Sequence, residues 1–131
     1  MNRTAVNPWD WSLKYGFNQG EVLEGASRVL VCAGQTAIDG GGNVKHAGDM
    51  KAQMGLALDN LDAVLKGGGM TLANVVGLTI YTTDVDQVLA NWAVLAERLG
   101  AAGVTPPQTL LGISRLAFPE LMVEIEATAV A

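Results

Sequence analysis

The final segment, residues 121–131, alternates in polarity with a period of two, which is the spacing of a β-strand. One face of this strand would carry Leu121, Val123, Ile125, Ala127 and Ala129, and the other would carry Met122, Glu124, Glu126, Thr128 and Val130. Two carboxylates so close together do not belong in a closed core. The second face must therefore meet water, a cleft or a partner subunit.

A long amphipathic helix is predicted over residues 49–66, with Gly67, Gly68 and Gly69 as its stop signal. The spacing places Lys51, Gln53, Asp59 and Asp62 largely off the buried stripe. The stripe itself consists of apolar residues at helical spacing, namely Met50, Met54, Ala57, Leu58, Leu61, Val64 and Leu65. We interpret the two methionines as core residues rather than as a ligand surface.

The remaining elements follow from apolar runs and turn signals. Strands are predicted over residues 28–33, 75–81 and 108–115, with a further short strand within 15–22 and a turn at 38–44. A second helix should begin after Asp84, with Gln87 as its capping-box partner, and end near Gly100 and Gly103. This order predicts one α+β domain, residues 1–131, in which a mixed sheet carries two helices on one face.

Composition narrows the classes of function. Half of the 131 residues are hydrophobic and 16% are charged, so we expect some apolar surface to be buried against other subunits. A net charge of −5 with scattered basic residues disfavours nucleic-acid binding. No apolar run suggests a membrane span or a signal peptide, and the single cysteine, Cys32, fits a reducing cytoplasmic location. Cys32 is interpreted as a packing residue and His46, the one histidine, as a surface residue, so no metal site is expected.

Four segments together resemble the Rid family, also known as YjgF or L-PSP proteins. YGFNQG at 15–20 is similar to the family's GPYSQA, and VCAGQ at 31–35 to its VSGQ strand end. Residues 48–69 resemble its first helix, and PPQTLLGISRL with MVEIEATAVA, 106–116 and 122–131, its C-terminal strands. The resemblance implies a chorismate-mutase-like fold, a homotrimer, and small-molecule clefts between subunits. It also implies metal-free and cofactor-free hydrolysis of enamines and imines such as 2-aminoacrylate and 2-iminopropanoate.

The resemblance also implies a set of site residues. Gln108 stands where active members have an arginine for the substrate carboxylate, and it offers hydrogen bonds but no charge. Glu124 matches the family carboxylate at the reacting water, whereas Glu126 is expected to be structural. Arg115 lies on the same predicted strand as Gln108, but its odd spacing from Gln108 is expected to turn its side chain to the other face. The expected catalytic residues are Glu124 and Gln108, and the expected substrate-binding residues are Phe17 (for a family tyrosine), Asn18 (for a serine), Gly34, Gln35, Gln108 and Thr109.

Three functions are therefore open. The first is an enamine/imine deaminase with an altered ligand preference. The second is a non-catalytic binding or regulatory trimer, which the loss of the arginine and of the tyrosine hydroxyl favours. The third is an endoribonuclease, which the acidic charge disfavours.

Overall fold

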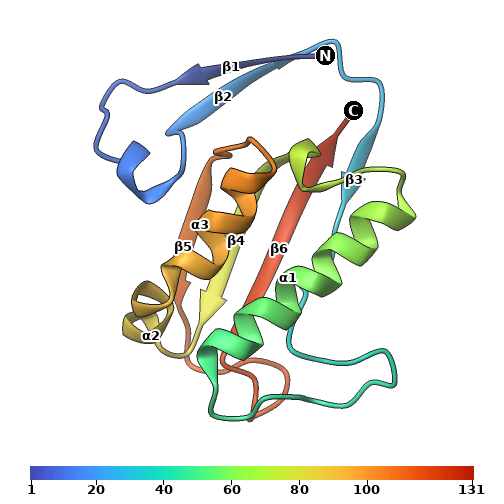
Figure 1. Ribbon diagram of the computed structural model, residues 1–131, viewed down its shortest axis with the longest axis vertical. Helices are drawn as coiled ribbons and strands as arrows, with labels where there is room; N and C mark the ends of the chain where they lie inside the picture. The colour runs from blue at the N-terminus through green and yellow to red at the C-terminus, as the bar shows by residue number, and fades with distance from the viewer.

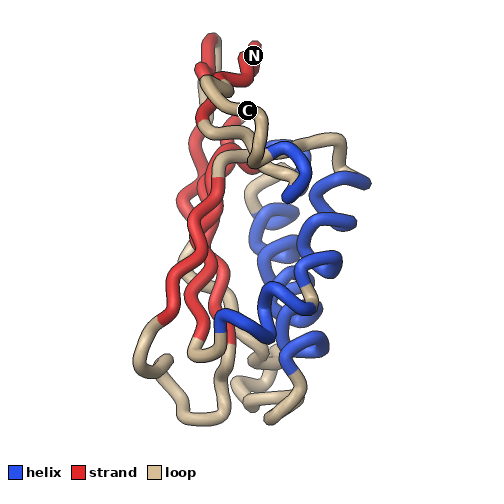
Figure 2. The backbone as a smooth tube through the Cα atoms, turned by 90° about the vertical axis from the view of Figure 1, so that its left-hand side faces the viewer, coloured by secondary structure: helices blue, strands red, loops and turns tan.

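The computed structural model describes all residues, 1–131, and has two layers, with every helix on one face of the larger sheet (Figures 1 and 2). The strands are β1 (Asn2–Val6), β2 (Gly20–Glu24), β3 (Val29–Val31), β4 (Val75–Thr82), β5 (Gln108–Gly112) and β6 (Val123–Val130). The helices are α1 (Met50–Gly67), α2 (Val85–Ala90) and α3 (Trp92–Ala101), with short 3-10 turns η1 (Leu13–Tyr15) and η2 (Leu72–Asn74). The predicted α+β class with a mixed sheet is confirmed.

The larger sheet has the strand order β3-β6-β4-β5. Its β4–β5 pair is parallel, and its other two pairs are antiparallel. Thr79 of β4 lies opposite Glu126 of β6, and Tyr81 lies opposite Glu124. Strands β3 and β5 form the two edges, so the sheet within one chain is open on both sides.

The alternation predicted for the last strand is confirmed except at its end. Leu121, Val123, Ile125, Ala127 and Ala129 are buried, whereas Glu124, Glu126 and Thr128 are partly exposed on the helix-free face. Val130, which was predicted on the same face as the two glutamates, is buried. A main core of 19 buried residues fills the space between the sheet and the helices, and a small second cluster consists of Ala37, Leu116 and Leu121. Figure 2 shows that no helix lies on the opposite face of the sheet.

Helix α1 begins where predicted, because the side chain of Asp49 accepts a hydrogen bond from the Ala52 amide. The prediction that Gln53 points away from the core is wrong, since this residue is fully buried. Its amide donates to the Glu120 carbonyl and accepts from the Met122 amide, each at 2.8 Å. Gln53 thereby satisfies backbone groups of the loop that leads into β6, which a periodicity pattern could not reveal.

The second predicted helix is divided in two at Asn91. Asp84 caps α2 as expected, because its carboxylate accepts from the Gln87 backbone amide. The capping box is incomplete, however, since the Gln87 side chain donates to the Asp84 carboxylate and the Asp84 backbone amide donates to Thr82 instead. The side chain of Asn91 then donates to the Gln87 carbonyl at 2.9 Å and competes with the continuing helix. Val88 of α2 and Leu95 and Leu99 of α3 are buried.

The N-terminal hairpin of β1 and β2 was not anticipated: the strand predicted within 15–22 lies at Gly20–Glu24, and its partner β1 was missed. Arg3 anchors this hairpin to the rest of the fold. Its guanidinium pairs with Glu21 at 2.7 Å and donates to the carbonyls of Ala73 and Val75. Figure 1 shows the hairpin beyond one end of the sheet, above the start of β5.

None of the helices combines the length and the apolarity needed to cross a bilayer.

Candidate functional site

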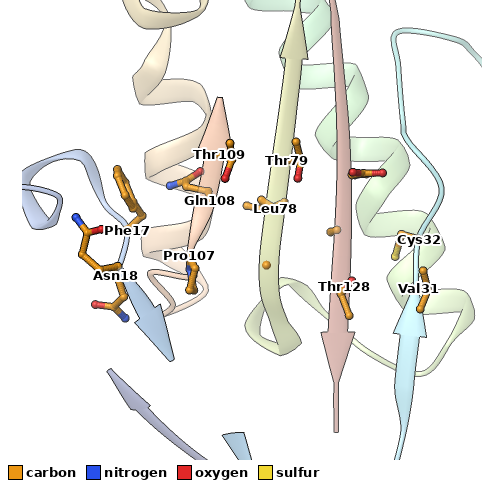
Figure 3. Close-up of a pocket in the computed structure, with 14 residues that line it drawn as sticks. Phe17, Asn18, Val31, Cys32, Leu78, Thr79, Pro107, Gln108, Thr109 and Thr128 are labelled. Atoms are coloured by element: carbon orange, nitrogen blue, oxygen red, sulfur yellow. The ribbon is translucent and has the colours of Figure 1, made fainter. Parts of the chain in front are cut away.

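The helix-free side of the sheet is hollowed near the start of β5. This sheet-face hollow has a volume of about 620 Å³ and is lined by Phe17, Asn18, Gln19, Val31, Cys32, Gly77, Leu78, Thr79, Pro107, Gln108, Thr109, Glu126, Ala127 and Thr128 (Figure 3). Four of the predicted site residues, Phe17, Asn18, Gln108 and Thr109, meet there. Glu126 is the one charged residue in its lining.

Gln108 opens the edge strand β5, and Figure 3 shows its side chain extending toward Phe17, away from β4. Its Oε1 atom is shielded from solvent and has no hydrogen-bond partner. The neighbouring Gln19, which the residue-by-residue prediction omitted, also lines the hollow, and its Nε2 atom is likewise buried without a partner. A buried polar atom without a partner typically costs about 1–3 kcal/mol, and the hydroxyl oxygen of Ser12 is a third such atom. Of the three, only the two glutamine amides belong to residues that line the sheet-face hollow.

A second cavity lies on the helix side of β5. This edge pocket, of about 410 Å³, is lined by Tyr15, Phe17, Leu89, Trp92, Gln108 and Leu110. Trp92 is held by the hydrogen bond from its indole nitrogen to the Tyr15 carbonyl, at 2.8 Å. Phe17 is braced by Trp11, whose ring meets it edge-on with centroids 5.9 Å apart. Phe17 and Gln108 line both cavities and therefore form the wall between them.

Glu126 is tied to Tyr81 on the helix-free face. The Tyr81 hydroxyl donates to its carboxylate at 2.5 Å. This hydrogen bond to a carboxylate, reinforced by desolvation and by the negative charge, raises the pKa of Tyr81 above its ordinary value of about 10. The hydrogen bond fits the prediction of a structural role for Glu126, although its place in the hollow also sets the local charge.

Glu124 lies instead against Gly34. A Cβ atom on Gly34 would lie 2.6 Å from Cδ of Glu124, so the glycine is required for the close approach of this carboxylate. The reason is a local irregularity in the chain after β3. The backbone amide of Cys32 donates to the Ala127 carbonyl, and the backbone amide of Gln35 donates to the Ile125 carbonyl. The chain therefore advances three residues after β3 while β6 advances two. The extra residue is a bulge, which turns the Gly34 backbone over the carboxylate.

Gly34 and Gln35 belong to a third cavity, the loop hollow, lined by Gly34, Gln35, Thr36, Ile38, Asp39, Gly40 and Asn60. The side-chain nitrogen of Gln35, Nε2, donates to the Ala33 carbonyl at 3.2 Å. Asp39 closes the predicted turn at 38–44, accepting from the backbone of Asn43 and Gly41. These hydrogen bonds, the one from Asn43 first, hold the pKa of Asp39 below its ordinary value despite some desolvation.

Within one chain the predicted site residues therefore form two groups. Gln108, Phe17 and Thr109 lie at the β5 edge, whereas Gly34 and Gln35 follow the opposite edge strand, β3. Three strand spacings of about 4.8 Å separate these edges, or roughly 14 Å. Within one chain, Gly34 and Gln108 therefore lie toward opposite edges of the sheet, although the sheet-face hollow reaches from Val31 of β3 to Gln108 of β5.

Other candidates take clear places. The side chain of Asn18 is occupied, since its amide bonds to Asn7, Glu21 and Thr105 and joins the hairpin to the chain before β5. Arg115 lies beyond the end of β5, which stops at Gly112 rather than continuing to 115 as predicted. Its guanidinium bonds to the adjacent Leu116 carbonyl and lines none of the cavities.

The remaining reactive side chains suggest no further chemistry. Cys32 is buried, and desolvation raises the pKa of its thiol, which disfavours the nucleophilic thiolate. His46 is exposed in the turn before α1 and has a positive φ of 59°. The structure contains no cluster of three or more His, Cys, Asp or Glu residues that could hold a metal ion.

Residues 15–131 match the family model described as endoribonuclease L-PSP. The chain belongs to the L-PSP family, also called Rid or YjgF. A RutC family protein of Pyrococcus horikoshii is 33% identical to it over 104 residues, which cover 79% of this chain and 80% of that protein.

Solved structures agree with this membership of the Rid family. A Rid-family protein of unknown function from Yersinia pestis, YyfB, is 36% identical, covers 100% of both chains and superposes with a TM-score of 0.86. The YjgF gene product of Escherichia coli is 26% identical over 87% of each chain, with a TM-score of 0.70. The resemblance that the sequence motifs indicated is confirmed.

Proposed function

We propose that this Rid-family chain is an enamine/imine deaminase that works as a homotrimer. Each cleft would combine the β5 edge of one subunit, with Gln108 and Phe17, and the Gly34–Glu124 region of the next. The observation that supports the proposal is the Glu124 carboxylate, which lies against Gly34 at the helix-free face in space that any other side chain at position 34 would fill. A fold that reserves a glycine for one carboxylate is positioning that group for chemistry.

Association is supported by the surface that surrounds these groups. Val29, Val31 and Leu111 lie on the helix-free side of the sheet and are 65%, 77% and 44% exposed. Apolar side chains along a sheet face favour burial against another copy of the chain. The separation of the two groups of site residues at opposite edges has the same explanation, because a closed ring of sheets would bring unlike edges together.

The chemistry needs few groups. Water adds to the carbon of the protonated imine and loses a proton to the Glu124 carboxylate, giving a neutral carbinolamine. The protonated Glu124 returns this proton to the nitrogen. As the carbon–nitrogen bond breaks, the carbinolamine hydroxyl gives its proton to the Glu124 carboxylate, so that a carbonyl compound and ammonia leave and the ammonia takes up that proton. Such proton transfer by a positioned carboxylate contributes about 10²–10⁴-fold. Gln108 would orient the substrate through its amide.

The test is hydrolysis of freshly generated 2-iminopropanoate, followed as ammonia and pyruvate release above the uncatalysed rate. Wild-type protein should accelerate release, and Glu124→Ala should abolish the acceleration. Sedimentation should give the mass of three chains for both proteins. Acceleration that survives in Glu124→Ala, or a stable single-chain species in dilute buffer, would refute the proposal.

A second candidate is a binding or regulatory protein on the same scaffold without turnover. It is favoured by one observation, namely that neither the sheet-face hollow nor the edge pocket is lined by an arginine or lysine. Ligand binding with no ammonia release from any imine would favour this candidate. RNA cleavage is disfavoured by the net charge of −5, and a thoroughly purified sample should leave RNA intact.

A further inference from the structure

The two unpartnered amides and the apolar cavity beside them restrict what the cleft can bind. We infer that the ligand head group is an uncharged primary carboxamide rather than a carboxylate, and that it carries an aromatic or similarly bulky apolar substituent. This inference rests on the proposed function for the identity of the site. The reacting molecule would then be an imine or enamine of an uncharged amide.

The head group follows from hydrogen-bonding capacity. Gln108 presents a buried Oε1, which needs a donor, and Gln19 presents a buried Nε2, which needs an acceptor. A primary carboxamide supplies both, through its N–H and its C=O. A carboxylate supplies acceptors alone, so it would leave Gln108 Oε1 unpaired.

The charge around the head group leads to the same choice. Glu126 is the one charged residue that lines the sheet-face hollow, and it is acidic. A carboxylate bound there would lose part of its hydration without gaining a cation from this chain. An uncharged amide avoids both costs, which makes Gln108 a specificity-determining residue.

The substituent follows from the edge pocket, which begins on the other side of the same Gln108 and Phe17 wall. Five of its six lining residues are apolar or aromatic, including the rings of Tyr15, Phe17 and Trp92. Its volume of about 410 Å³ lies within the range of about 300–1,000 Å³ usual for small-molecule pockets. Aromatic walls favour a flat apolar group through edge-to-face and offset stacking.

The experiment uses four stable probes that separate the head group from the substituent: 3-phenylpropanamide, 3-phenylpropanoate, propanamide and propanoate. Dissociation constants come from NMR titration of the full-length protein, with the side-chain amide signals of Gln19 and Gln108 as direct reporters. We expect 3-phenylpropanamide to bind at least about 10-fold more tightly than each of the two probes that lack one of its groups.

Variants assign each preference to its residues. Gln108→Leu and Gln19→Leu should remove the preference for amide over carboxylate, and Gln108→Arg should reverse it. Leu89→Ala should reduce the advantage of the phenyl group without endangering the fold, because Leu89 is 52% exposed. Trp9→Ala is the matched control, since Trp9 is exposed and lines no cavity.

Three outcomes with the wild-type protein would overturn the inference. They are tighter binding of 3-phenylpropanoate than of 3-phenylpropanamide, equal binding of 3-phenylpropanamide and propanamide, and binding of none of the four probes. Because the readout is binding, it is separate from turnover. Amide-selective binding without any imine hydrolysis would refute the deaminase while leaving the ligand class standing. Hydrolysis of 2-iminopropanoate together with carboxylate-selective binding would refute the ligand class while leaving the deaminase standing.

Discussion

Substituting Gly34 by alanine should separate catalysis from folding. The new Cβ would lie 2.6 Å from Cδ and 2.7 Å from Oε1 of Glu124. Carbon atoms prefer separations of about 3.5–4.0 Å, so the carboxylate must move by roughly 1 Å. A displacement of this size at a reacting group can cost about 10²-fold in rate, and we expect a loss of that order in the turnover of imines.

The same substitution should change stability little. The atoms that must yield belong to the end of a flexible side chain, and an off-rotamer torsion costs about 0.5–1.5 kcal/mol. The backbone of Gly34 does not adopt a positive φ, so alanine introduces no strain there. Urea unfolding at matched protein concentration should therefore give a change of about 1 kcal/mol or less.

The assay compares initial rates of ammonia release for wild type, Gly34→Ala, Glu124→Gln and the double variant. Gly40→Ala is the matched control, since a Cβ there meets nothing within 4 Å. If alanine acts only by displacing Glu124, the double variant should be no slower than Glu124→Gln alone. Wild-type rates in Gly34→Ala, or a further loss in the double variant, would refute the reasoning.

Three further predictions concern other residues. Gln108→Arg should increase hydrolysis of 2-iminopropanoate by roughly 10-fold to 100-fold, measured as initial rates, and no gain would mean that the cleft lacks more than a carboxylate anchor. Gln53→Leu should lower the free energy of unfolding in urea by about 2–4 kcal/mol, because the buried Glu120 carbonyl and Met122 amide lose their partner; an unchanged midpoint would contradict this. In a Tyr15→Phe background the alkaline absorbance titration reports Tyr81 alone. Because the pKa of Tyr81 is raised, its hydrogen bond to Glu126 persists below that pKa and is lost as pH rises through it, so Glu126→Gln should move the midpoint down toward about 10.

The sequence predicted those elements whose polarity pattern is dictated by the core. The strand at Val123–Val130 and the helix at Met50–Gly67 were located within a few residues, because each has one continuous apolar face. The hairpin strand β1 was missed, since its residues are mostly exposed and bury no apolar stripe. The burial of Gln53 and the break of the second helix at Asn91 were not predicted, because the two side chains bond to backbone that is distant or one turn back. Periodicity carries no such information.

The candidate site was predictable as a set of residues but not as an arrangement. Phe17, Gln108 and Thr109 were expected together and do share one hollow. The distance between Gly34 and Gln108 depends on strand order, which no local motif encodes. Gln19 was not predicted as a site residue. The sequence did point to it, because Gln19 in YGFNQG aligns with the glutamine of the family segment GPYSQA.

The unpaired backbone along β3 and β5 has a consequence for handling the protein. An uncovered strand edge can pair with any other extended chain, and natural proteins normally protect it. If the proposed trimer forms, substitutions that weaken contacts between its subunits should therefore yield visible precipitate rather than dispersed single chains. Searches for a soluble one-chain form would succeed sooner with a lysine or proline placed in these strands than with changes on the helical layer.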